Sequence, residues 1–135
     1  MKTHLYHLQI NVSDAAKSLP FYKNLFASLN YKITDESAEH VGVSNGTTDF
    51  WIIATEEDYI KNGFNRKNTG LNHLAFRVES KKMVDDFTAG FLKKHSVSAL
   101  YGTPKTFPEY RPDYYAVYFE DPDRIKLEVV YIPEQ

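Results

Sequence analysis

The stretch Asn72-His73-Leu74-Ala75-Phe76-Arg77-Val78 repeats a pattern near the start of the chain, Tyr6-His7-Leu8-Gln9-Ile10-Asn11-Val12. The spacing between these two stretches also aligns Phe21 with Phe87. Self-similarity at a fixed spacing is the sequence signature of an internal duplication. We therefore expect two similar modules in one chain.

The composition narrows the class of protein. The chain has 135 residues, 42% hydrophobic and 25% charged, with a net charge of −2. These values are typical of a globular domain with a core of its own, and they give no indication of a nucleic-acid surface. The chain has no cysteine, which excludes disulfides, thiolate metal sites and cysteine nucleophiles. The N-terminus has no apolar run of signal-peptide length and no segment has the length of a membrane span, so we expect a cytoplasmic protein without a membrane partner.

The first module is predicted to cover residues 1–55. Residues 4–12 alternate between apolar and polar side chains, as in a strand with one buried face. Helical spacing over residues 13–29 predicts an amphipathic helix, for which Ser13-Asp14 offers an N-cap. Pro20 either kinks this helix or marks its first turn, with Ser18 as the cap in the second case.

Three strand-like runs complete the first module, and a polar linker follows. The runs are residues 31–34, 39–43 and 48–55. Asn45-Gly46 predicts a hairpin turn between the last two. Residues 56–70 are polar and rich in Gly and Asn, and we interpret them as a linker that holds about one helical turn.

The second module is predicted to cover residues 71–135 in the same order, strand, helix and three strands. It begins with a strand over residues 72–78 and a helix capped by Ser80. The apolar face of that helix is predicted from its spacing to consist of Met83, Val84, Phe87, Phe91 and Leu92. The further strands are predicted near residues 97–101, 114–119 and 125–131. Residues 102–113 contain three prolines and predict an ordered loop.

In each predicted strand, the alternation of side chains places a candidate metal ligand on the polar face, opposite the apolar residues. His7 has the opposite parity to Leu8 in the first strand, and His73 repeats this in the second module. Glu128 has the opposite parity to Leu127 in the last strand. A pseudo-twofold relation between the modules would bring these polar faces together. Two neutral imidazoles and a carboxylate are a ligand set for a divalent transition metal with open positions for substrate. His4, His40 and His95 have no duplicated counterpart, so we leave them out of the site.

The chain resembles the vicinal oxygen chelate superfamily over nearly its whole length. The resemblance is carried by His7-Leu-Gln-Ile-Asn-Val-Ser-Asp, by Ser18-Leu-Pro-Phe-Tyr22, by the second histidine strand and by the Asp121-Pro122-Asp123 turn before the last strand. The group includes glyoxalase I, fosfomycin-resistance thiol transferases, extradiol dioxygenases and bleomycin-resistance binding proteins. The resemblance implies a single α+β domain over residues 1–135, in which two tandem βαβββ modules form a cup-shaped mixed sheet with the helices on the outside.

The resemblance also implies a site and a function. The metal ligands fall on His7, His73 and Glu128, and Glu128 is also the candidate catalytic residue. The fourth position of the glyoxalases falls on Trp51, which cannot bind a metal. The implied function is that of a metal-dependent lyase, thiol transferase or ring-cleaving dioxygenase that uses zinc, manganese, nickel or iron to chelate adjacent oxygens of a small-molecule substrate. The rival interpretation is a metal-free protein that sequesters a drug in the same cup.

Further residues are predicted to line the substrate pocket. Asn11 and Arg77 share strand faces with the two histidines, and Trp51 is placed opposite Glu128. The aromatic loop and the start of the next strand contribute a candidate substrate lid, formed by Tyr110, Arg111, Tyr114 and Tyr115. Because a chain of this size leaves sheet edges to cover, we also expect a homodimer. The sequence leaves open whether the modules of one cup come from one chain or are exchanged between two.

Overall fold

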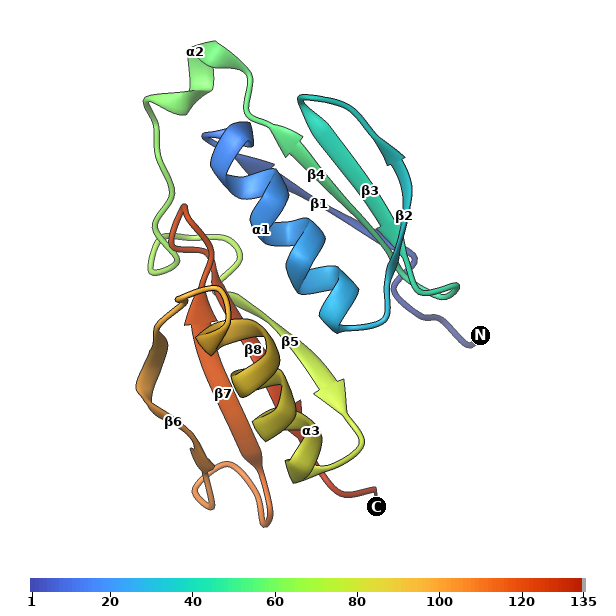
Figure 1. The fold of residues 1–135 in the computed structure, drawn as a ribbon, viewed down its shortest axis with the longest axis vertical. Coiled ribbons are helices and arrows are strands. Elements are labelled where there is room, and N and C mark those ends of the chain that lie inside the picture. Colours follow the sequence, from blue (N-terminus) through green and yellow to red (C-terminus); the bar gives the residue numbers. More distant parts are fainter. Residues whose placement is uncertain (135) are drawn as a thin grey trace. The chain divides into compact units, whose positions relative to one another are not determined.

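A computed structural model describes residues 1–134, and the chain divides into two compact units, Met1–Gly63 and Phe64–Gln135. The boundary between the units falls within the 56–70 stretch. Each unit contains a four-stranded mixed sheet with a helix packed against it (Figure 1). No helix in the described part of the chain combines the length and the apolar character needed to cross a membrane.

The first unit has the predicted β-α-β-β-β order. Its elements are β1 (His7–Val12), α1 (Ala15–Ser28), β2 (Lys32–Glu36), β3 (His40–Ser44), β4 (Asp49–Ala54) and the short α2 (Glu57–Ile60). The strands lie in the order β1-β4-β3-β2, with β1 parallel to β4 and the other neighbours antiparallel. The hairpin between β3 and β4 turns at Asn45, whose side-chain oxygen accepts hydrogen bonds from the backbone N–H groups of Thr47 and Thr48.

The second unit repeats this order and this topology. Its elements are β5 (His73–Val78), α3 (Lys81–Phe87), the π-helical continuation η1 (Thr88–Lys93), β6 (Ala99–Thr106), β7 (Tyr115–Glu120) and β8 (Lys126–Tyr131). The strands lie in the order β5-β8-β7-β6, and β5 is parallel to β8. The prediction of two tandem βαβββ modules is therefore confirmed.

The structure decides between the two alternatives for Pro20. Helix α1 begins at Ala15, and the Asp14 side chain caps it by accepting a hydrogen bond from the Lys17 N–H group. Ser18 is consequently a buried residue within the helix and not its cap. A proline inside a helix removes one backbone hydrogen bond. Burial of Tyr22, Leu25 and other side chains against the sheet offsets that loss.

In each unit an apolar core lies between the helix and its sheet. In the first unit Phe26 packs against Phe50 of β4, and in the second unit Phe87 packs against Phe119 of β7. The prediction for Met83 was wrong, because its side chain is 44% exposed. Successive helix residues are rotated by about 100°. The buried face begins at Val84, so the preceding residue points to solvent.

The prediction of a loop over the whole of residues 102–113 was also wrong, because β6 runs on to Thr106. The pairing of β6 with β7 shifts register between Leu100 and Lys105, which is the signature of a bulge. Thr103 holds the bulge together, since its hydroxyl donates to the Leu100 carbonyl and accepts from the Tyr118 N–H group. Hydrogen bonds from a side chain thus replace part of the strand ladder, and the sequence pattern alone does not reveal them.

Candidate functional site

The strand register places His73 and Glu128 on the sheet face opposite α3. On β8, Leu127 and Val129 are buried, and these two side chains share the face toward α3. Glu128 therefore lies on the other face, beside Ala75 of β5 and Tyr118 of β7. His73 lies on the same face, at the start of β5. We call this surface, which faces away from α3, the open face of the second unit. Part of it is buried, because Ala116, Tyr118 and Val130 form an apolar cluster there with Phe107.

His73 and Glu128 form a close pair of potential ligands. The His73 Nε2 atom is 3.3 Å from the Glu128 Oε2 atom. The Glu128 side chain is only 1% exposed, whereas the imidazole is 35% exposed. The Oε2 atom has no hydrogen-bond partner among the described residues. A buried carboxylate oxygen in this condition requires a compensating proton or cation.

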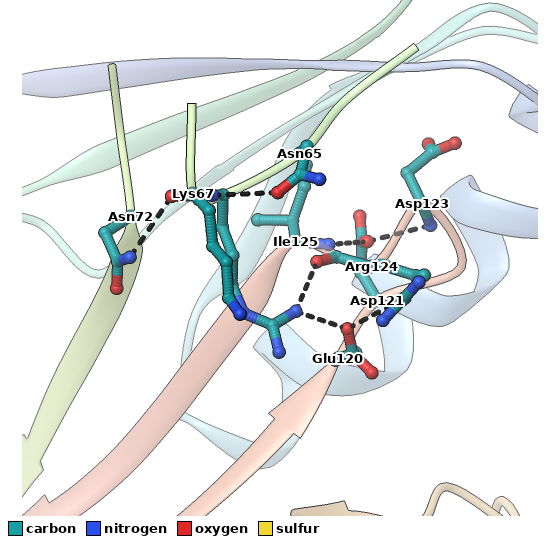
Figure 2. A network of polar contacts seen from close by, with 9 residues as sticks. Asn65, Lys67, Asn72, Glu120, Asp121, Asp123, Arg124 and Ile125 are labelled. Carbon is teal, nitrogen blue, oxygen red and sulfur yellow. Dashed lines mark hydrogen bonds and ion pairs between the residues drawn. The ribbon is translucent and has the colours of Figure 1, made fainter. Parts of the chain in front are cut away.

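The neighbouring residue Asn72 sets the tautomer of His73. The Asn72 side-chain nitrogen donates to the Arg66 carbonyl at 3.1 Å, which leaves its side-chain oxygen as an acceptor (Figure 2). That oxygen is 2.7 Å from the His73 Nδ1 atom, so Nδ1 carries the hydrogen and donates it. The Nε2 atom then faces Glu128. A metal-binding histidine usually donates its other ring N–H group to a carboxylate, a backbone carbonyl or a water, and here the Asn72 side-chain oxygen takes that place.

Two tyrosines hold the other side of the Glu128 carboxylate. The Tyr114 hydroxyl donates a short hydrogen bond to the Glu128 Oε1 atom. Burial, together with this bond to the carboxylate, raises the pKa of Tyr114 to about 12. Burial also raises the pKa of Tyr118, and the adjacent Tyr114 and Glu128 raise it further. Both phenols therefore stay neutral at neutral pH, and Tyr114 leaves only the Oε2 atom available for another partner.

This donor set fits a divalent transition metal. When the imidazole is neutral, its Nε2 lone pair faces the Glu128 Oε2 atom, which is unfavourable unless a proton or a metal ion lies between them. Within residues 1–134, however, no group of three or more His, Asp or Glu side chains lies close enough to hold a metal ion. The second unit supplies two ligands, and the third predicted ligand, His7, belongs to the first unit.

In the first unit the same sheet face carries different chemistry. His7 is exposed at the start of β1, with its ring edge-on to Tyr6. Trp51 pairs with Gln9 across β4 and β1, which is the register position that Glu128 holds beside Ala75 in the second unit. The indole lies over Gly42 so closely that a Cβ atom there would be 2.7 Å from the ring.

The structure brings some of the other predicted pocket residues to the open faces. Asn11 shares the exposed face of β1 with His7, and its side-chain oxygen accepts a hydrogen bond from Gln9. Arg77 shares the face of β5 with His73, and its guanidinium donates to the Ile132 carbonyl at 2.7 Å. Tyr110 is 62% exposed.

Tyr110 and Arg111 stabilise the loop that contains them. Tyr110 stacks on Phe107, with ring centres 5.4 Å apart. Arg111 closes the turn before Tyr114, since its carbonyl accepts the Tyr114 N–H group. Tyr115 lies on the opposite face of the sheet, where its hydroxyl donates to Asp85 of α3 at 2.7 Å. The structure therefore places Tyr115 apart from His73 and Glu128.

Sequence reasoning missed the roles of Asn72 and Tyr118 and gave Tyr114 only a role as lid. Asn72 directly precedes His73, so its position beside a candidate ligand was an available signal. Tyr118 has the parity of Glu120 and not of the buried Phe119, which also places it on the open face. No sequence signal shows that the Tyr114 hydroxyl reaches Glu128, because that contact depends on the path of the loop.

Comparison with known proteins identifies related sequences. The model of the "Glyoxalase/Bleomycin resistance protein/Dioxygenase superfamily" matches residues 4–129. The uncharacterised protein YqjT of Bacillus subtilis (strain 168) is 32% identical over 126 residues, which cover 93% of this chain and 97% of that protein. The metallothiol transferase FosB of Staphylococcus epidermidis is 25% identical over 129 residues, which cover 94% of this chain and 80% of FosB.

Solved structures show the same fold. A crystal structure of a glyoxalase candidate from Bacillus halodurans superimposes with a TM-score of 0.85 and 36% sequence identity, covering 95% of each chain. The fosfomycin resistance protein FosX from Listeria monocytogenes has a TM-score of 0.67 and 21% identity, covering 98% of this chain and 95% of FosX. At that identity the second likeness supports the fold alone.

Proposed function

Because the chain belongs to the glyoxalase/bleomycin resistance protein/dioxygenase superfamily, we propose that it is a metal-dependent enzyme for a small molecule that binds through two adjacent oxygens. The observation that carries this proposal is the buried Glu128 carboxylate. Its Oε2 atom lacks a hydrogen-bond partner within the described chain and faces the His73 Nε2 atom at 3.3 Å. Occupation of this position by a cation would remove the cost of the unpaired oxygen.

In this proposal His7, His73 and Glu128 hold one divalent ion, which is zinc, manganese, nickel or iron. When bound, the ion supplies Lewis-acid stabilisation of negative charge on the substrate oxygens. His73 contributes Nε2 because Asn72 keeps the hydrogen on Nδ1. Glu128 contributes Oε2 because Tyr114 occupies Oε1. Both ligands are thereby oriented in advance.

Trp51 narrows the reaction class. It occupies in β4 the register position that Glu128 occupies in β8, and an indole supplies neither a metal ligand nor a base. Glyoxalase-type isomerisation moves a proton between adjacent carbons and needs carboxylate bases at the metal. We therefore expect little or no methylglyoxal–glutathione isomerase activity. Thiol transfer, another lyase reaction and oxidative ring cleavage remain within the proposal.

The test is metal analysis of protein purified without an affinity tag, followed by calorimetric titration of the dialysed protein. We expect one divalent ion per chain with micromolar or tighter affinity. His73→Gln and Glu128→Gln should lose this affinity, whereas His4→Gln, which alters an exposed histidine outside the site, should retain it. Failure of the unaltered protein to take up zinc, manganese, nickel, cobalt or iron would refute the proposal.

The assembly of the site belongs to the same proposal. We propose that residues 1–135 form one domain in which modules 1–55 and 71–135 are joined by the linker 56–70, and that two chains form a homodimer. Sedimentation at tens of micromolar should show the dimer, and a monomer throughout that range would contradict it.

A ligand-sequestering protein is the second candidate. The half-exposed Trp51 indole over Gly42 favours it, because a flat aromatic surface on an open sheet face can stack a planar ligand. The two candidates differ in their response to a chelator. Ligand binding that quenches Trp51 emission equally with and without chelator would favour sequestration over metal-dependent catalysis.

A further inference from the structure

Lys126 carries a positive charge on the open face of the second unit, next to the candidate ligands. It pairs in register with His73 across β8 and β5, so the two side chains project from adjacent strands on the same face. Its ammonium group lies 4.9 Å from the Tyr101 ring centre and 4.8 Å from the Tyr118 ring centre. Two cation–π contacts therefore fix the charge in place.

No carboxylate in the described chain lies within ion-pairing distance of Lys126. Its register neighbour on β7, Glu120, is already shared by two other cations. The Arg66 Nη1 atom is 2.5 Å from the Glu120 Oε2 atom, and the Arg124 Nε atom is 3.3 Å from the same oxygen (Figure 2). Within residues 1–134 the charge of Lys126 thus has no carboxylate counter-ion.

The Tyr101 phenol lies in the field of these cations. Burial by itself raises the pKa of Tyr101, but the adjacent Lys126 and Arg66 outweigh that effect and lower it. The backbone of Tyr101 holds a φ of 60°, which the bulge in β6 imposes, and its ring packs edge-on against Tyr118 at 5.5 Å. The local environment consequently favours a negative group beside Lys126, and the position is flanked by the half-exposed Tyr101 ring and the buried Tyr118 ring.

We propose that Lys126, together with Tyr101 and Arg66, forms a subsite for an oxyanion group, a carboxylate or a phosphate, on the substrate. This inference rests on the proposed function, because it specifies the chemistry of the small molecule that would bind at His73 and Glu128. The aromatic contacts hold the ammonium in one position, so the Lys126 side chain loses less conformational entropy when the ligand binds. The substrate is then an acid or a phosphorylated compound that also carries the metal-binding oxygens.

The test uses the full-length protein in the presence of a chelator, with inorganic phosphate and acetate as separate probes in backbone amide NMR titrations. We expect saturable binding of at least one probe, with the largest shift changes around Lys126 and Tyr101. Lys126→Gln should weaken this binding by about tenfold or more, the typical value of a charged hydrogen bond. Lys126→Arg should retain most of it. The preferred probe identifies the oxyanion as tetrahedral or planar.

Lys105 provides the matched control, because its ammonium also lies over an aromatic ring, at 5.2 Å from the Phe107 ring centre. Lys105→Gln should bind both probes as the unaltered protein does. Equal binding by Lys126→Gln and Lys105→Gln, or no saturable binding by the unaltered protein, would overturn the subsite. Since the titration excludes metal, this outcome is distinct from failure of metal uptake, which would overturn the proposed function instead.

Discussion

The two units share a topology and a register but differ in the chemistry of one sheet face. Phe50 and Leu127 occupy the same register position toward the helices, and both are buried and apolar. One residue further along, Trp51 covers Gly42 in the first unit, whereas Glu128 accepts a hydrogen bond from the Tyr114 hydroxyl in the second. Burial against the helix keeps one face of the repeated strand apolar in both units, while the side chains on the other face differ in chemistry.

The largest effect is expected on the sheet face that packs against the helix in both units. Phe50→Ala and Leu127→Ala should each lower the free energy of unfolding by about 2–5 kcal/mol, because each leaves a cavity in a closed core. If the two units form one domain, both variants should shift one cooperative transition followed by calorimetry. Two separate transitions, each moved by only one of the variants, would show that the units are independent.

A smaller effect is expected on the divergent face of the first unit. Gly42→Ala places a Cβ atom 2.7 Å from the Trp51 ring, so it should cost about 1–3 kcal/mol in denaturant unfolding. The double variant Gly42→Ala with Trp51→Leu removes the clash and should recover much of this loss. A cost that persists unchanged in the double variant would mean that the indole does not rest on Gly42.

The divergent face of the second unit is tested by its carboxylate clamp. Tyr114→Phe removes the donor to the Glu128 Oε1 atom and should weaken metal affinity about 10–100-fold, as loss of an outer partner of a metal ligand typically does. Tyr115→Phe is the matched control, because it removes a hydroxyl that binds Asp85 on the helix face. Equal affinities in the two variants would argue against the clamp.

The smallest effect is a pH dependence on the helix face of the second unit. The hydrogen bond to Asp85, followed by burial, raises the pKa of Tyr115 to about 12 from its ordinary value of 10.0. The folded state therefore retains a proton that the unfolded chain loses, and stability from this pair is present below pH 10 and falls between pH 10 and about 12. Tyr115→Phe should flatten that part of the stability curve, measured by urea unfolding. An identical slope in both proteins would exclude the linkage.

Much of the fold was predictable because the duplicated pattern is a pattern of burial. The strand patterns in residues 4–12 and 72–78 and the helical spacing after Asp14 and Ser80 predict both β-α starts. The structure confirms them, with β1 beginning at His7 and β5 at His73. The bulge in β6 was not predictable, because it depends on the Thr103 hydroxyl bonding to a neighbouring strand. Such tertiary hydrogen bonds leave no periodic trace in the sequence.

For the candidate site, strand parity in the sequence was enough to put His73 and Glu128 on one face, since side chains on a strand must alternate. The sequence also determined the family resemblance and the exchange of a carboxylate for Trp51. Only the tertiary structure decided that Asn72 contacts the His73 Nδ1 atom, that Tyr114 binds one Glu128 oxygen and that Lys126 lies between two rings with no carboxylate partner in the described part of the chain. These features arise from atoms of different segments that meet within hydrogen-bonding or van der Waals distance, and that proximity is a property of the folded chain and not of residue order.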